Sequence, residues 1–161
     1  SITNRQGYGA NYNKATNAVH SNSQYVLPLE DDWRLTRPLD LDPYVQDLND
    51  TTFNSVRFGY IGWSFEQLAR FVGINFRTYL ELLPESKNQY VFSGHPRLEK
   101  VSYQRSIGLW PEGFSPGQTE IMVAGRTKAR QGILWPVWEC PTPFVHFGDI
   151  KSGWLEHAHT N

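Results

Sequence analysis

The chain has 161 residues, a formal net charge of −1 and an aromatic content of 14%, including six Trp. This length suits one globular domain with its own hydrophobic core rather than two domains. The near-zero net charge argues against a general nucleic-acid or membrane-surface binder, and the single Cys, Cys140, excludes an internal disulfide framework.

Residues 1–24 contain no Asp or Glu and are rich in Asn, Gly, Ser and Thr. Such a composition cannot bury enough apolar surface to order itself. We therefore expect an extended polar arm, held by the rest of the domain or by a neighbouring subunit, while residues 25–161 form a single globular domain. Within this arm Arg5, Tyr8 and Tyr12 are the candidate partner contacts.

Three short elements are expected between the arm and residue 61. The apolar run at 25–29 predicts a short strand. Asp42 before Pro43 combines a capping carboxylate with Pro at the first helical position, which predicts a helix from Pro43 to Asn49. Alternation of apolar and other residues predicts a strand over 52–61.

Residues 64–83 carry the strongest periodic signal, with apolar side chains in steps of three and four. These are Phe65, Leu68, Ala69, Val72, Phe76, Leu80 and Leu83. The spacing predicts one long amphipathic helix that begins at Ser64 and ends at Pro84.

Part of this stretch, residues 65–82, resembles a helix-turn-helix unit, because small Ala69 is followed four residues later by Gly73. The sequence leaves open whether it forms one helix or two. Three cations and three acids balance between residues 64 and 87, and a neutral surface is poorly suited to binding phosphates. We therefore favour a buried core helix over a DNA-reading element.

Short β-rich runs separated by Gly and Pro fill the remainder of the chain, and five strands are expected there, at 90–93, 98–109, 119–125, 132–139 and 144–150. The predicted fold is therefore α+β and predominantly antiparallel β, resembling a sandwich or barrel. One long amphipathic helix and an extended N-terminal arm complete it.

Two stretches carry opposite charge. Residues 30–50 hold seven acids against two cations, beginning with Glu30, Asp31 and Asp32, whereas residues 94–130 hold six cations against three acids. Arg126, Lys128 and Arg130 stand two residues apart, so an extended backbone would place them on one side as a cationic fork. Opposed patches suit head-to-tail contacts between subunits, and the alternative is that both are solvated or adjacent within one monomer.

No sequence motif indicates catalysis or a cofactor. The chain lacks a G-x-S-x-G elbow, a P-loop, a dinucleotide-binding glycine pattern and an H-E-x-x-H motif. Glu156, His157 and His159 are of types that bind zinc, but they stand at the end of the chain without a third ligand nearby in sequence, so we predict no metal site. We favour a disordered tail or a tail docked at an interface, and a metal site is the alternative.

These observations favour a non-catalytic structural subunit of a homo- or hetero-oligomeric particle, such as a viral coat, decoration or connector protein. A nucleic-acid-binding protein that uses 65–82 or the cationic fork is the alternative. A carbohydrate-binding module comes third, because the flat faces of aromatic side chains stack on sugar rings, and an enzyme comes last. The candidate aromatic residues are Trp110, Trp135, Trp138 and Trp154, with Tyr90 and Tyr103. Neither a signal-peptide h-region nor an apolar run of about 18 residues occurs, so we expect no membrane partner and a virion or cytoplasmic location.

Overall fold

The computed structural model describes residues 7–19, 21–58, 68–83, 85, 94–126, 133–139 and 142–147. In chain order its elements are α1 (Tyr8–Ala18), β1 (Tyr25–Val26), β2 (Trp33–Leu35), α2 (Asp42–Asn49), β3 (Ser55–Arg57), β4 (Ala69–Ile74), β5 (Arg77–Leu82), β6 (Arg97–Lys100), α3 (Val101–Ile107), α4 (Pro116–Arg126), β7 (Ile133–Pro136), a 3₁₀ turn (Val137–Glu139) and β8 (Phe144–His146). Across these ranges no helix combines the length and the apolar character needed to cross a lipid bilayer.

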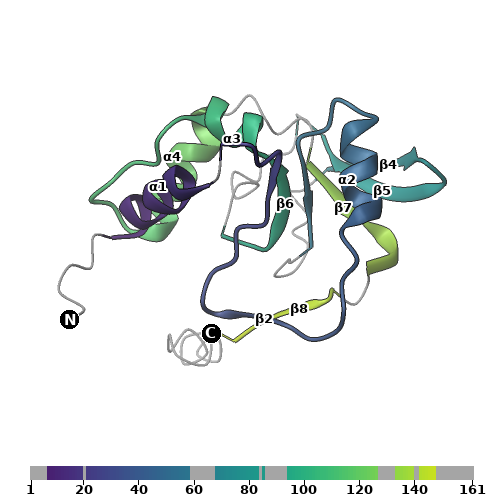
Figure 1. The fold of residues 1–161 in the computed structure, drawn as a ribbon, viewed down its shortest axis with the longest axis horizontal. Helices are drawn as coiled ribbons and strands as arrows, with labels where there is room; N and C mark the ends of the chain where they lie inside the picture. The colour runs from purple at the N-terminus through teal and green to yellow at the C-terminus, as the bar shows by residue number, and fades with distance from the viewer. Residues whose placement is uncertain are drawn as a thin grey trace.

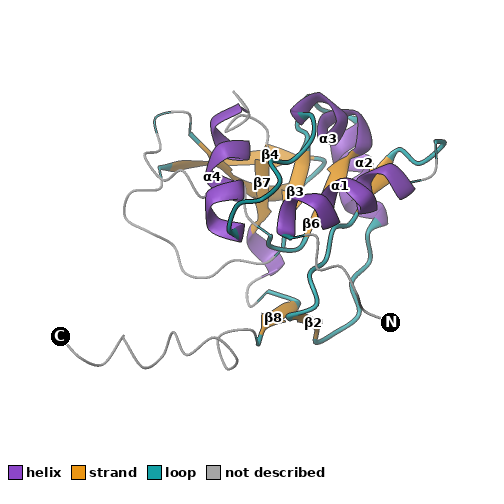
Figure 2. Ribbon diagram, turned by 90° about the vertical axis from the view of Figure 1, so that its left-hand side faces the viewer, coloured by secondary structure: helices purple, strands orange, loops and turns teal. Residues whose placement is uncertain are grey.

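A six-stranded mixed sheet forms the centre of the molecule, in the order β1-β6-β3-β7-β5-β4. The β3–β7 pair is parallel, and the other neighbouring pairs are antiparallel. Strands β2 and β8 form a separate antiparallel ribbon below the main sheet (Figure 2). Helices α1, α3 and α4 gather on one side beside β6, whereas α2 lies at the other side beside β5 and β7 (Figure 1).

Two apolar clusters hold these elements together. The larger one packs α2 against the sheet through residues such as Tyr44, Leu48, Val56, Tyr79 and Leu134. The smaller one joins α3 to α4 and is covered by α1, and its members are Tyr103, Ile107, Trp110, Val123 and Ala124, with Tyr8 and Tyr12 packed against them. Helix α1 therefore belongs to the folded body.

The predicted fold class is wrong in its main points: the described chain has a mixed sheet and four helices of modest length rather than a sandwich or barrel with one long helix. The predicted long helix is the hairpin of β4 and β5, in register from Ala69↔Leu82 to Ile74↔Arg77. Asn75 and Phe76 form its turn with φ of 44° and 66°, as a two-residue hairpin requires. No helix-turn-helix unit exists over residues 69–82.

The spacing of apolar residues led to the wrong element because the same residues also suit two short strands. Apolar side chains three and four apart can lie on both faces of a hairpin, and length could not separate the two structures. Phe, Val, Ile, Thr and Tyr favour strands, and Gly73 weakens a helix interior. The hairpin also places Tyr79 in the larger core and Glu81 in a buried position. Tertiary burial therefore outweighed the helical pattern.

Two predicted strands are largely helical. Residues 98–109 contain the end of β6 followed by α3, and 119–125 lie within α4. A start signal for α4 is present in the sequence, because Ser115, Pro116 and Gln118 form a capping box with Pro at the first helical position. The Ser115 hydroxyl lies 2.9 Å from Gln118 Oε1, and the Ser115 N–H donates to the same oxygen at 3.2 Å.

Other local predictions are confirmed. Helix α2 begins at Asp42, β1 and β3 lie within the runs expected to form strands, and β7 and β8 lie within 132–139 and 144–150. The strand expected at 90–93 lies outside the described residues.

The extended N-terminal arm is wrong for residues 8–18, which form α1. Small residues bring this helix close to its neighbours, since a Cβ at Gly9 would lie 1.9 Å from the carbonyl oxygen of Pro111. Buried Asn13 completes the attachment: its Nδ2 donates to the Trp110 carbonyl at 3.0 Å, and its Oδ1 accepts from the Trp110 N–H at 2.8 Å. Paired polar groups and one aromatic cluster thus order a segment that is poor in aliphatic residues.

Candidate functional site

A pocket of about 590 Å³ lies between α1 and the segment 26–31. Its apolar lining consists of Ala15, Val19, Val26, Leu27, Pro28 and Leu29. Its polar lining consists of Tyr8, Asn11, Tyr12, Thr16, Glu30, Asp31, Gly94 and Gln104. The lining mixes apolar and polar residues, and we call the region of Tyr8, Glu30 and Gly94 its polar end; among the described residues the charged lining side chains, Glu30 and Asp31, are both acidic.

Helix α1 supplies the tyrosines of this pocket from one face, because Tyr8 and Tyr12 stand one turn apart. The Tyr12 ring stacks on Trp110 at a centroid distance of 3.8 Å, and Tyr8 meets the same indole edge-on at 5.7 Å. Both rings are thereby fixed in place. The two tyrosines predicted to contact a partner instead pack within their own domain.

Two carboxylates compete for one hydroxyl at the polar end of the pocket. The Tyr8 hydroxyl donates to Glu30 Oε1 at 2.6 Å, and Glu120 Oε1 lies 3.3 Å from the same hydroxyl. Glu120 also accepts the Gly94 N–H at 2.6 Å. Glu30 precedes β2, Glu120 lies on α4 and Gly94 precedes β6, so three separate parts of the chain meet at Tyr8.

Burial shapes the protonation of this cluster. It raises the pKa of Glu30 to about 6, although the Tyr8 hydrogen bond acts in the opposite direction. Burial also raises the pKa of Glu120, against the hydrogen bonds from Gly94 and Tyr8. The pKa of Tyr8 is raised by burial and then by the two neighbouring carboxylates. The phenol therefore keeps its proton, and Glu30 titrates close to neutral pH.

Glycine at position 94 allows Glu30 to occupy this place. A Cβ on residue 94 would lie 1.7 Å from Glu30 Oε1, a separation that real atoms do not reach. Any larger side chain would displace the carboxylate or move the backbone. The close approach shows that the Glu30 carboxylate is packed against the main chain.

A buried ion pair lies behind the pocket and connects it to the sheet. Arg97 Nε lies 2.8 Å from Glu99 Oε2, with side-chain exposures of 5% and 0%. Arg97 Nη2 also donates to the Tyr12 hydroxyl. Strand β6 thus fixes the position of α1 through a charged group as well as through aromatic packing.

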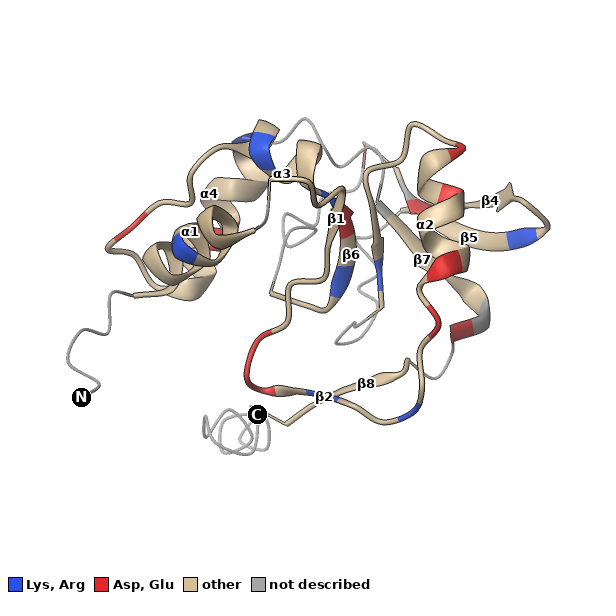
Figure 3. Cartoon of the chain, viewed as in Figure 1, with Lys and Arg blue, Asp and Glu red and all other residues tan. Residues whose placement is uncertain are grey.

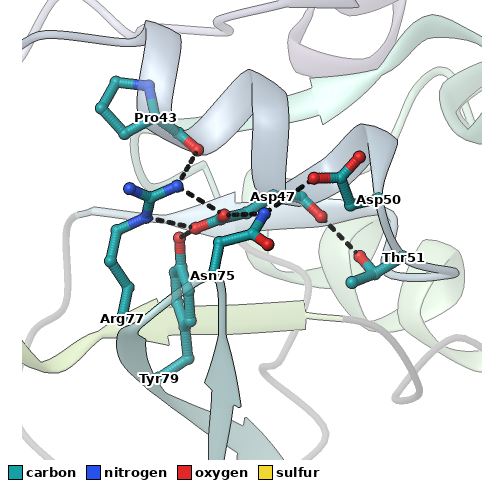
Figure 4. Close-up of polar contacts among 7 residues, drawn as sticks. All are labelled: Pro43, Asp47, Asp50, Thr51, Asn75, Arg77 and Tyr79. Carbon is teal, nitrogen blue, oxygen red and sulfur yellow. Dashed lines mark hydrogen bonds and ion pairs between the residues drawn. The ribbon is translucent and has the colours of Figure 1, made fainter.

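A second polar network, around Asp47, is structural (Figure 4). Asp47 is fully buried, and its carboxylate accepts from Arg77 at 2.6 and 2.7 Å, from Asn75 at 2.9 Å and from the Tyr79 hydroxyl. All three donors belong to the β4–β5 hairpin, and Asp47 lies on α2. Groups of the fold satisfy this carboxylate, so the network holds the hairpin on the helix rather than forming a ligand site.

The structure separates the residues of the predicted charge patches. Acidic positions lie on α2 and on the segment that leads into β2 (Figure 3). Asp31 is exposed at the pocket, whereas Asp32 Oδ2 lies 3.2 Å from His146 Nε2 and joins the β2–β8 ribbon. Arg126 ends α4 and donates to the Leu109 carbonyl. Arg5, Lys128 and Arg130 lie outside the described residues, so the cationic fork has no described geometry.

The other sequence candidates contribute no site to the described chain. Trp110 and Trp135 are buried and offer no exposed face for a sugar. Within the described ranges no three His, Cys, Asp or Glu side chains gather as metal ligands, and Glu156, His157 and His159 lie outside them. Sequence reasoning missed the pairing of Tyr8 with Glu30 and Glu120, for which the sequence holds no local signal. Comparison with protein-family models, curated proteins and solved structures finds no match to this chain.

Proposed function

We propose that this domain binds a small organic molecule in the pocket between α1 and residues 26–31. The observation that carries the proposal is a cavity of about 590 Å³ with aliphatic walls and a carboxylate held by a tyrosine at its polar end. Ligand sites usually combine a cavity of roughly 300–1,000 Å³, apolar walls and a few well-placed polar groups.

Preorganisation supports this proposal. Glu30 is held by the Tyr8 hydroxyl and packed against Gly94, and Tyr8 is itself packed on Trp110. A ligand would therefore meet a carboxylate whose position is already determined, and binding would cost little side-chain entropy. Burying the Glu30 and Glu120 carboxylates beside Tyr8 lowers the stability of the fold, and such costly groups are typical of sites that bind a ligand.

Filling the pocket should abolish binding. Ala15 lines the pocket on α1, whereas Ala18 is exposed on the same helix and does not line it. We expect Ala15→Trp to weaken fragment binding by about tenfold or more, equivalent to ~1.4 kcal/mol, and Ala18→Trp to leave it unchanged. Ligand-observed NMR with a set of small amines, alcohols and acids measures this. Binding that survives Ala15→Trp would place the ligand elsewhere.

A structural subunit of an oligomeric particle, in a virion or in the cytoplasm, is the second candidate function. The β4–β5 hairpin favours it, because Phe71 is 72% exposed, Phe76 is fully exposed and β4 is the last strand of the described sheet. Exposed apolar edge strands are templates for pairing with another chain. Since α1 packs within its own domain, this candidate rests on the hairpin rather than on residues 8–18.

Phe76→Gly should separate folding from association. Phe76 has φ of 66°, a left-handed conformation that costs a non-glycine residue roughly 1–2 kcal/mol and that Gly adopts without this cost. Gly also gives the unfolded chain more conformational entropy, which removes about 0.5–1 kcal/mol of this gain. We expect stability to rise by up to about 1 kcal/mol while self-association weakens, because the exposed ring is lost. Urea unfolding and sedimentation velocity measure the two effects. Unchanged self-association would show that the hairpin tip does not take part in an interface.

A further inference from the structure

We infer that the ligand of this pocket is an organic amine with an apolar body, bound as its ammonium form with Glu30 as counter-ion. This inference rests on the proposed function and names the chemical class of its ligand. Three independent features of the pocket point to this class: its charge, its open hydrogen-bonding atoms and its walls.

The charge of the pocket is acidic, and the described cation that acts on Glu30, Arg97, does so through space without a hydrogen bond to it. Four carboxylates elsewhere in the described chain, each little exposed, contact an arginine: Asp47, Glu81, Glu99 and Glu139. Glu30 differs, because its hydrogen-bond partner among the described residues is the neutral Tyr8 hydroxyl, which binds Oε1. Oε2 receives no described hydrogen bond. A partly buried carboxylate without a cation in contact is suited to a cationic ligand.

The open polar atoms around the pocket are acceptors. Gln104 is 5% exposed and donates through Nε2 to Thr16 Oγ1 at 3.1 Å. The Thr16 hydroxyl in turn donates to the Tyr12 carbonyl at 2.9 Å, so it must accept from Gln104, and this determines the orientation of the amide. Gln104 Oε1 is then a buried acceptor without a partner in the described chain. Because protein atoms enclose Gln104 Oε1, the acceptor that a ligand can reach is Glu30 Oε2, which calls for a ligand that donates hydrogen bonds.

The walls define the remainder of the ligand. The aliphatic residues Val19, Val26, Leu27 and Leu29 line the same pocket as Glu30. An alkyl or aryl group next to the ammonium would bury its surface there, and each added methylene should tighten binding about fourfold. A metal ion does not fit these features, because hard cations require several oxygen ligands and no three metal-binding side chains gather in the described chain.

Protonation of Glu30 should oppose amine binding. The titratable and charged groups that face it are Tyr8, Asp32, Glu120 and Arg97. Because burial places the pKa of Glu30 at about 6, the carboxylate is largely ionised at pH 7.5 and largely protonated at pH 5. Amine affinity should therefore fall by about tenfold between these two pH values.

Three probes of equal length test the inference on the full chain: hexylamine, 1-hexanol and hexanoate. By calorimetry and ligand-observed NMR at pH 7.5, hexylamine should bind at least about tenfold more tightly than 1-hexanol, and hexanoate should bind most weakly. Glu30→Gln should reduce hexylamine binding to the level of 1-hexanol. The control Glu85→Gln removes an exposed acid that does not line the pocket and should change nothing.

The possible failures are distinguishable. If hexylamine and 1-hexanol bind with equal affinity, compete with each other, and keep their affinity in the Glu30→Gln variant, the amine inference is overturned while the pocket remains a binding site. If none of the three probes binds and Ala15→Trp has no effect in the fragment screen, the proposed function fails as well. Comparison of probes on the unmodified chain keeps the test valid even where a variant folds poorly.

Discussion

Asp47→Ala should lower the free energy of unfolding by about 3 to 5 kcal/mol, the usual cost of removing one partner of a buried charge pair. The carboxylate is fully buried and binds Arg77, Asn75 and Tyr79 from the hairpin. Its loss would leave these donors facing a small cavity and would release the hairpin from α2. Arg77 also donates to the Pro43 carbonyl at 3.2 Å, so the guanidinium would keep one partner.

Urea unfolding followed by circular dichroism measures this change, and the neighbouring acid provides the control. Asp50 is exposed, and among the described residues its carboxylate accepts one side-chain hydrogen bond, from the Asn75 amide at 2.8 Å, so Asp50→Ala should cost less than about 1 kcal/mol. Equal losses for the two variants would show that the Asp47 network does not stabilise the fold.

Acid pH should reproduce part of the Asp47 effect. Burial works to raise the pKa of this carboxyl, but the hydrogen bonds from Arg77, Tyr79 and Asn75 outweigh it and hold the pKa below its usual value. A lowered native pKa means that the stabilisation is present above the unfolded pKa, near 3.8, and disappears as the pH falls through the lower native value. Stability should therefore decline below about pH 4, and Asp47→Ala should show a shallower decline.

Arg97→Ala should cost a similar 3 to 5 kcal/mol, because it strands Glu99 in a buried position without a counter-charge. The substitution also removes the hydrogen bond to the Tyr12 hydroxyl and so weakens the attachment of α1 to the sheet. The double substitution Arg97→Met with Glu99→Leu should recover most of the loss, since buried ion pairs can often be replaced by apolar residues of similar volume.

Arg70 supplies the matched control for Arg97. It also pairs with a glutamate on a strand, Glu81, at 2.7 Å, but its side chain is 64% exposed. Arg70→Ala should cost clearly less than Arg97→Ala, because solvent reaches this pair through the exposed guanidinium, whereas both partners of the Arg97–Glu99 pair are buried. Chemical denaturation of the three variants compares them. A double substitution no more stable than Arg97→Ala alone would show that the cost comes from lost packing rather than from the stranded charge.

Local chemistry determined several elements correctly. Asp42 before Pro43 was sufficient to locate α2, because an acid in the first turn and a Pro near the helix start both act locally, although the N-cap is Leu41 and no side chain caps the helix. The capping box of Ser115 and Gln118 is equally local and marks the start of α4, although the strand predicted over 119–125 was wrong. The single Cys, which excludes an internal disulfide framework, and the lack of a long apolar run can also be read directly from the sequence.

The tertiary structure decided everything that joins distant residues. Residues 69–82 satisfy a helical and a strand pattern, and only pairing of β5 with β7 and burial of Tyr79 selects the strands. The pocket depends still more on the fold. Glu30 lies 22 residues and Glu120 lies 112 residues after Tyr8 in the chain. Hydrogen bonds between such distant groups form only after the helices and the sheet have packed. Sequence periodicity reports which side of an element is buried, but not which buried groups meet.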